Sequence, residues 1–125
     1  MKIAISVFAL ALALSTMSTH GEEAKGKVLY HVVCFKFNDN ATAEQIKKIE
    51  TDFRALKEKI PLVQSYSGGA NFNEEKGKGF KHCSVLTFKS EEDLKAYIAH
   101  AAHQEFVKLI KECVADAFVM DYWEK

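Results

Sequence analysis

Tyr97, His100 and His103 lie within a seven-residue stretch at the end of a predicted amphipathic helix. Imidazole is the side chain that most readily exchanges protons near neutral pH. Two further histidines, His31 and His82, fall inside strand patterns, on faces that we expect to be turned toward that helix. A phenol and several imidazoles gathered in a small fold are typical of a proton-transfer site or a ligand pocket. The sequence thus predicts the place of a site better than its reaction.

Three of these histidines also have a simpler interpretation. His31 or His82 alone could be a core histidine bonded to a nearby carbonyl, and His100 suits a helix C-terminal cap or a solvent-facing position. No metal site is predicted, because no carboxylates recur with the histidines at ligand spacing. The predicted pocket consists of His31, Val33, Phe35, His82 and Ser84 on the strands, with Tyr97 and His103 opposite.

The segments that must position these residues follow two periodicities. Strand patterns occur within 28–37, 62–72, 80–88 and 117–123, and helical spacing of apolar residues occurs over 42–60 and 90–113. Thr42 and Gln45 fit a capping box at the start of the first helix, and Pro61 ends it. This order predicts an α+β fold: a ferredoxin-like split βαβ subunit whose four-stranded antiparallel sheet carries helices on one face.

The second face of that sheet is also expected to be covered. Tyr30, Val32, Cys34, Val85 and Thr87 alternate with the pocket-facing residues, and together they are too apolar to leave exposed to water. A homodimer that packs sheet against sheet is the simplest way to cover them.

Cys34, Cys83 and Cys113 are an odd number of cysteines, so at least one is free or paired between chains. None shows the Cys-x-x-Cys spacing of redox motifs and zinc sites. We interpret them as small buried hydrophobic residues.

Residues 1–21 have the organisation of a secretory signal peptide. Lys2 supplies a positive charge, residues 3–14 are apolar or small, and residues 15–21 give a small, polar exit. We therefore expect a signal peptide over 1–21, a leader over 22–27 and one domain over 28–123, exported to the periplasm or secreted. Loss of Lys2 would leave 16 basic against 17 acidic residues. Such a balance gives no reason to expect nucleic acid, or a membrane after signal cleavage, as a partner.

Seven short motifs then follow one another in an order and spacing that resemble a known family. They are His31 with Val33, Phe35-Lys36-Phe37, Gly68-Gly69, Gly79-Phe80-Lys81-His82, Leu86-Thr87-Phe88, Tyr97 with His100 and His103, and Asp121-Tyr122. The family is the stress-responsive dimeric A/B barrel (Dabb) domain, including dimeric α+β barrel proteins of the olivetolic acid cyclase type. The resemblance implies a ferredoxin-like subunit, a dimer whose two sheets form a barrel, and no cofactor. Some relatives hold magnesium on backbone carbonyls, which would lie near Ile60 to Val63 here.

The resemblance also implies roles for individual residues. In the cyclase type, a Tyr and a His carry out an intramolecular aldol reaction on a linear polyketide, and Tyr97 and His103 match them. His103 would be the general base on an acidic C–H, while Tyr97 would donate a hydrogen bond to the enolate oxygen. His31 and His82 match histidines that line the same cavity. Asp121 is interpreted as a structural hydrogen-bond acceptor.

One departure from the family pattern concerns the helix. The family usually reads His-Pro-Ala-His, whereas this chain reads His100-Ala101-Ala102-His103. In an unbroken helix Tyr97 and His103 would lie on faces about 120° apart. A site that uses both therefore needs a bend near Ala101, which alanine does not force.

Three functions are compatible with these residues. The first is an exported protein that holds a small apolar or aromatic ligand between sheet and helices. The second is a cofactor-free enzyme, either an aldol-type cyclase or a relative of the barrel monooxygenases, that uses Tyr97 and His103. The third is a structural stress protein whose stable dimer is itself the function.

Overall fold

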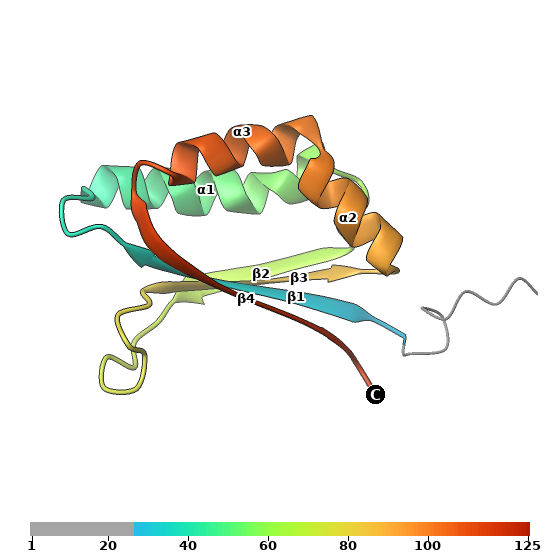
Figure 1. The fold of residues 1–125 in the computed structure, drawn as a ribbon, viewed down its shortest axis with the longest axis horizontal. Coiled ribbons are helices and arrows are strands. Elements are labelled where there is room, and N and C mark those ends of the chain that lie inside the picture. Colours follow the sequence, from blue (N-terminus) through green and yellow to red (C-terminus); the bar gives the residue numbers. More distant parts are fainter. Residues whose placement is uncertain (1–26) are drawn as a thin grey trace, which may run out of the picture.

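The computed structural model describes residues 27–125. The predicted signal peptide over 1–21, and all but the last residue of the predicted leader over 22–27, lie outside the described residues. The described elements are β1 (Leu29–Phe37), α1 (Ala43–Lys59), β2 (Ser65–Ala70), β3 (His82–Phe88), α2 (Glu91–Ala99), α3 (Ala101–Ile110) and β4 (Val114–Trp123). Figure 1 shows them as two layers, with the helices on one side of the sheet.

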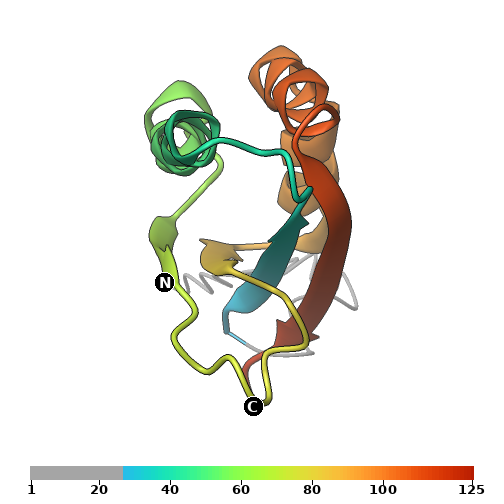
Figure 2. The ribbon, with the colours of Figure 1, turned by 90° about the vertical axis from the view of Figure 1, so that its left-hand side faces the viewer.

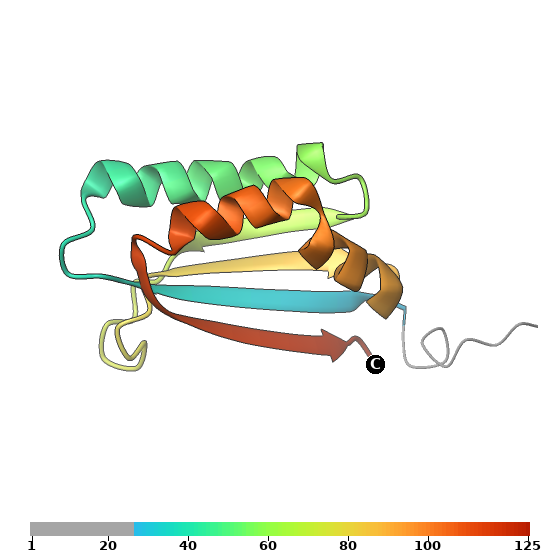
Figure 3. The same ribbon diagram turned by 45° about the horizontal axis from the view of Figure 1, so that its top comes forward.

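The sheet has the strand order β2-β3-β1-β4, and every neighbouring pair is antiparallel. Figure 3 shows these strands side by side beneath the helices, and the end view in Figure 2 shows that none of the helices within 27–125 lies on the sheet's other face. The predicted α+β, ferredoxin-like subunit is therefore confirmed.

The first helix begins and ends where its sequence dictates. The Thr42 hydroxyl accepts from the Gln45 N–H, and the Gln45 side chain accepts from the Thr42 N–H, which completes the predicted capping box. The helix ends before Ile60, which precedes Pro61. Its inner face buries Ile49, Phe53 and Leu56 against the sheet. Burying side chains of this size stabilises the fold by about 1.5–3 kcal/mol each.

Strand β1 alternates strictly between the two faces of the sheet. Its residues Leu29, His31, Val33 and Phe35 are buried beneath the helices, while the residues between them are half-buried on the opposite face. The Glu124 N–H donates to the Val28 carbonyl, so even-numbered β1 residues direct their backbone groups to β4. Odd-numbered residues consequently hydrogen-bond with β3.

Two strands begin at other residues than expected. β3 begins at His82 rather than near Phe80, and β4 begins at Val114 rather than Ala117. The first residues of β4 lack apolar alternation, but they pair with β1 through a register shift between Lys36 and Phe37. Pairing with a central strand therefore extends β4 where its own sequence gives no signal.

Candidate functional site

The predicted second helix is broken at His100 without a proline. His100 has ψ 141°, outside the helical region, and it both ends α2 and begins α3. Its backbone N–H donates to the Tyr97 carbonyl at 3.1 Å, and its Nδ1 accepts from the Ala102 N–H at 3.0 Å. His100 is thus a helix cap, as expected, and it caps both helices.

Two further side chains stabilise this break. In a continuous helix, the Ala102 N–H would donate to the Ile98 carbonyl, four residues earlier. Instead, His103 Nδ1 and Gln104 Nε2 donate to the Ile98 oxygen at 3.0 and 2.7 Å. The side chains of His100, His103 and Gln104 therefore satisfy the backbone groups that the break would leave unpaired.

The same hydrogen bond fixes the tautomer of His103. A carbonyl oxygen only accepts, so Nδ1 carries the proton and Nε2 is left as the basic atom of the neutral ring. Burial lowers the pKa of His103 from its ordinary value, with the Ile98 carbonyl opposing this effect and His31 adding to it. His103 is accordingly neutral at pH 7, in the form that can accept a proton.

Tyr97 lies between the two histidines of the site. Its ring centroid is 4.7 Å from that of His103 and 6.0 Å from that of His31. The side chain is almost completely buried. Burial, followed by the nearby Tyr66, raises the pKa of its hydroxyl well above the usual range. Tyr97 therefore stays protonated and is suited to donate a hydrogen bond, not to act as a base.

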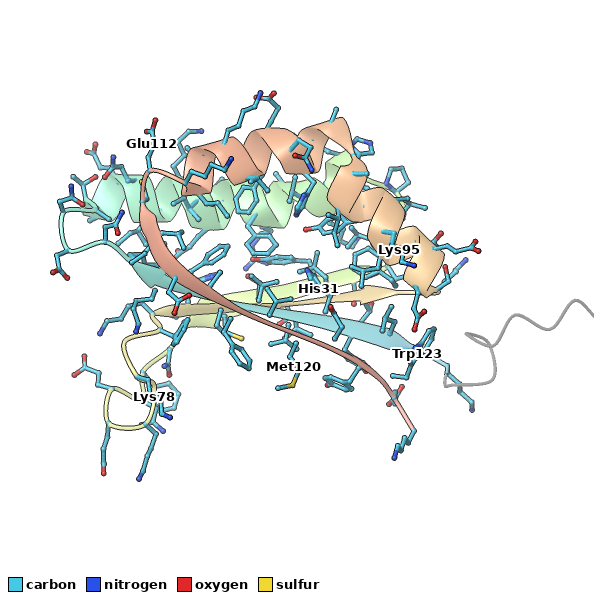
Figure 4. The ribbon with its side chains drawn as sticks, in the orientation of Figure 1. His31, Lys78, Lys95, Glu112, Met120 and Trp123 are labelled. Carbon is cyan, nitrogen blue, oxygen red and sulfur yellow. The ribbon has the colours of Figure 1, made fainter. Side chains whose placement is uncertain are left out.

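His31 is held by a carboxylate from the neighbouring strand. It lies opposite Asp121 in the β1–β4 register, and His31 Nδ1 donates to Asp121 Oδ1 at 2.5 Å. Because an ionised carboxylate accepts only, this bond places the His31 proton on Nδ1, as the Ile98 carbonyl does for His103. Both imidazoles thus keep Nδ1 engaged and present Nε2. In Figure 4, His31 lies in the space between sheet and helices.

These residues line one cavity of about 270 Å³ between α3, β1 and β4. Its polar groups come from His31, Tyr97, His103 and Asp121. Its apolar wall is formed by Val33, Phe35, Phe53, Ile98, Phe106, Val107, Ile110, Ala117 and Val119. Val119 is 51% exposed although it faces the helices, which places the mouth of the cavity at the β4 edge.

The structure places the predicted site residues in two groups. His31, Val33, Phe35, Tyr97 and His103 line this cavity. His82 and Ser84 lie on the same face of the sheet, but they are not part of the cavity lining.

His82 and Ser84 belong instead to a second polar cluster with Tyr66. The Tyr66 hydroxyl lies 2.8 Å from Ser84 Oγ, and His82 Nδ1 is 3.5 Å from the same oxygen. Burial lowers the pKa of His82. The Phe53 ring lines the cavity and also packs against the Tyr66 ring, with the two ring centroids 5.5 Å apart. Phe53 therefore contacts both the cavity and this second cluster.

Asp121 lines the cavity, although the sequence predicts it only as a structural hydrogen-bond acceptor. It is indeed a hydrogen-bond acceptor, but its partner is a cavity histidine. The signal that could have found it is topological: in a split βαβ subunit the last strand pairs with the first, and the register then places Asp121 opposite His31.

No group of three or more His, Cys, Asp or Glu residues within 27–125 is arranged to hold a metal ion. At the predicted magnesium position, the Ile60 carbonyl accepts from the Val63 N–H at 3.0 Å. Backbone-bound magnesium at Ile60 to Val63 stays a prediction, and no chemistry described below depends on it. Across residues 27–125, no helix combines the length and apolarity needed to cross a membrane.

The family model described as the Stress responsive A/B Barrel Domain matches residues 29–124, nearly the whole described chain. The chain belongs to this family. It is 32% identical over 102 residues to the stress-response A/B barrel domain-containing protein HS1 of Arabidopsis thaliana, covering 81% of this chain and 93% of that protein. It is also similar to the olivetolic acid cyclase of Cannabis sativa, 27% identical over 74% of this chain and 92% of the cyclase.

Solved structures share the A/B barrel subunit fold. A hydroxynitrile lyase from Passiflora edulis matches with a TM-score of 0.74 at 22% identity, covering 79% of this chain and 94% of the lyase. A dimeric ferredoxin-like protein from Thermobifida fusca matches with a TM-score of 0.69 at 24% identity, covering 84% of this chain and all of that protein's chain. At these identities the likeness shows the fold, and that this fold occurs in dimers.

Proposed function

We propose that this A/B barrel protein binds a small, mostly apolar or aromatic carbonyl compound in the cavity between sheet and helices. The observation that carries the proposal is the contrast within the lining: a wall of aliphatic and aromatic side chains surrounds a few polar groups that converge from four elements. A volume of about 270 Å³ suits a molecule built on a single ring. The Tyr97 hydroxyl would donate to the carbonyl oxygen.

A matched pair of alanines on β4 tests this binding. Ala117 lines the cavity, whereas Ala115, two residues earlier on the same strand, does not. Titration of the protein with acetophenone, followed by thermal unfolding, should give a saturable rise in Tm. Ala117→Phe should abolish this rise and Ala115→Phe should preserve it. A rise that persists in both variants would place the ligand elsewhere.

The second candidate function is cofactor-free proton transfer on the bound compound. It is favoured by the complementary states of two neighbouring side chains, a neutral His103 that presents Nε2 and a Tyr97 that stays protonated. His103 would take a proton from a carbon next to a carbonyl, and the developing enolate oxygen would accept a hydrogen bond from Tyr97.

An aldol-type cyclisation follows from the same step. The enolate carbon forms a bond to a second carbonyl carbon of the same molecule, and the resulting alkoxide takes the proton back from His103. No atoms are gained or lost, so the step needs no cofactor. The Cannabis sativa relative named for cyclase activity, and the lyase named for its hydroxynitrile substrate, show that proteins of this fold include enzymes. A monooxygenase-like reaction is the less favoured form of this candidate.

Proton abstraction can be tested without knowing the natural substrate. In D₂O, the methyl protons of acetophenone exchange for deuterium when a base removes them, and NMR follows the loss of signal. The protein should accelerate this exchange, and His103→Gln and Tyr97→Phe should each reduce the acceleration by about 10²-fold or more. Exchange no faster than in buffer would exclude the enzymatic candidate while leaving binding intact.

We also propose that two copies associate through the open face of the sheet. On that face Phe118, Met120 and Tyr122 are nearly half exposed, and Met120 points away from the helices in Figure 4. Tyr30 and Tyr122 stack there with ring centroids 5.0 Å apart. A contiguous apolar surface of this kind is typical of an interface. A structural protein whose function is this dimer is the remaining alternative, and it predicts that His31 and His103 tolerate replacement.

Export remains a proposal based on the residues of segment 1–21. The direct test is expression of the full chain in its source cells, followed by the mass and N-terminal sequence of the exported product. A product that begins near Glu22 supports it, whereas a full-length product retained in the cell contradicts it.

A further inference from the structure

Two of the three free cysteines, Cys34 and Cys83, lie directly opposite each other on the neighbouring strands β1 and β3. They are on the open face of the sheet, since both alternate with residues buried beneath the helices. Even-numbered β1 residues direct their backbone groups to β4, so Cys34 and Cys83 form a non-hydrogen-bonded pair with each other. Side chains approach most closely at such pairs, with Cα atoms about 4.5 Å apart, which is within the range that a disulfide spans.

Both cysteines line the same hollow of about 350 Å³, together with Gly69, Ala70 and Phe80. Burial, and after it the neighbouring Cys83 thiol, raise the pKa of Cys34 to about 11, so Cys34 keeps its proton at neutral pH.

The third strand beside this pair leaves it accessible. Gly69 lies opposite Cys83 on β2, and a Cβ atom added at Gly69 would meet no atom of residues 27–125 within 4 Å. In a single subunit, a small molecule can therefore approach Cys83 from this side before the open faces of two copies associate. Cys113, by contrast, is buried and lies outside the sheet, between α3 and β4.

We propose that Cys34 and Cys83 are a modification site at which a cross-strand disulfide links β1 to β3 within one subunit. The oxidant is a small-molecule disulfide. The Cys83 thiolate attacks it and one half leaves as a thiol, after which Cys34 gives up its proton and displaces the other half. Two cysteine thiols and one external disulfide thus become one protein disulfide and two external thiols. Cys113 keeps its thiol, which accounts for the odd number of cysteines.

The test uses the full chain and its Cys113→Ser variant, both treated with oxidised glutathione in the folded state and during refolding. Blocking of free thiols under denaturing conditions, followed by mass spectrometry, should show that Cys34 and Cys83 lose reactivity together. The chain should become about 2 Da lighter, and digestion should release a peptide pair joined through these residues. A link that forms in either treatment supports the proposal.

Matched variants separate this site from other outcomes. Cys34→Ser and Cys83→Ser should each abolish the loss of 2 Da, and Gly69→Val, which fills the hollow beside Cys83, should slow oxidation of the folded chain several-fold. In the linked Cys113→Ser chain, Tm should rise by about 5 °C or more and return on reduction. The proposal is overturned if both thiols remain reactive after both treatments. It is equally overturned if the disulfide joins two chains or includes Cys113.

Discussion

His31 and Asp121 lie directly opposite each other on β1 and β4, and the Asp121 carboxylate accepts a hydrogen bond from the Nδ1–H of His31. Odd-numbered β1 residues form non-hydrogen-bonded pairs with β4, so this pair also falls where cross-strand side chains approach most closely. One strand pairing thereby decides which nitrogen of a cavity histidine is available to a ligand.

Removal of the carboxylate should release His31 from this tautomer. In Asp121→Leu, Nδ1 loses its acceptor, so we expect long-range ¹⁵N–¹H NMR spectra to show a mixture of ring tautomers in place of the Nδ1–H form. Because Asp121 is partly exposed, the free energy of unfolding should fall by only about 1 kcal/mol. An unchanged tautomer in the variant would show that Asp121 does not position His31.

The break at His100 predicts opposite effects of proline at two adjacent positions. Ala101 is the first residue of α3, where a helix tolerates proline, and His100 already has the extended conformation that a residue before proline prefers. Ala101→Pro should therefore raise the free energy of unfolding by about 0.4–1 kcal/mol.

Ala102→Pro is the matched control. The Ala102 N–H donates to His100 Nδ1, and proline would remove this donor, so this variant should be destabilised. Chemical denaturation measures both effects. Destabilisation by Ala101→Pro equal to that by Ala102→Pro would mean that the helix is not broken at His100.

The extent to which sequence predicts this protein is clearest at that break. Periodicity and capping residues are local signals, and they correctly placed the sheet, the first helix and the two faces of β1. The break depends on three side chains that exchange backbone partners around Ile98, and no residue among them is a helix breaker. The sequence therefore predicts Tyr97 and His103 as site residues, but it does not predict that their side chains are in contact.

The separation of His82 from the cavity had a similar cause. His31 and His82 share one face of the sheet, as alternation indicates, yet alternation does not reveal which residues lie between them. In the β1–β3 register His82 lies opposite Phe35, four residues along β1 from His31, so the two imidazoles lie at different places along that face. Contacts between elements that are distant in the sequence thus decide which members of one face share a cavity.

Stability should fall as the pH decreases from 7 toward 5. The folded-state pKa values of His82 and His103 are lowered below the ordinary value of 6.5, mainly by burial. In that range the unfolded chain therefore binds more protons than the folded chain, and folding is penalised. Urea denaturation across this range should give a shallower pH dependence for His82→Gln and for His103→Gln than for the unaltered chain. An equally steep dependence in both variants would contradict these assignments.

A charge placed on the open sheet face should weaken association. Val32 lies between Val85 and Met120 on that face, so Val32→Asp introduces a carboxylate at its centre. Sedimentation at several concentrations should show a dimer for the unaltered chain and monomers for the variant. The exposed Lys95→Asp on α2 is the control and should leave the dimer intact. Equal association of both variants would place the interface elsewhere.

The proposed function places a small aromatic carbonyl compound in the cavity lined by His31, Tyr97 and His103. Its most direct test is an NMR titration with acetophenone that follows the ring resonances of all three residues. We expect saturable shifts at these rings, no comparable shift at His82, and loss of the response in Ala117→Phe. Unchanged resonances at His31 and His103 at saturating ligand would contradict it.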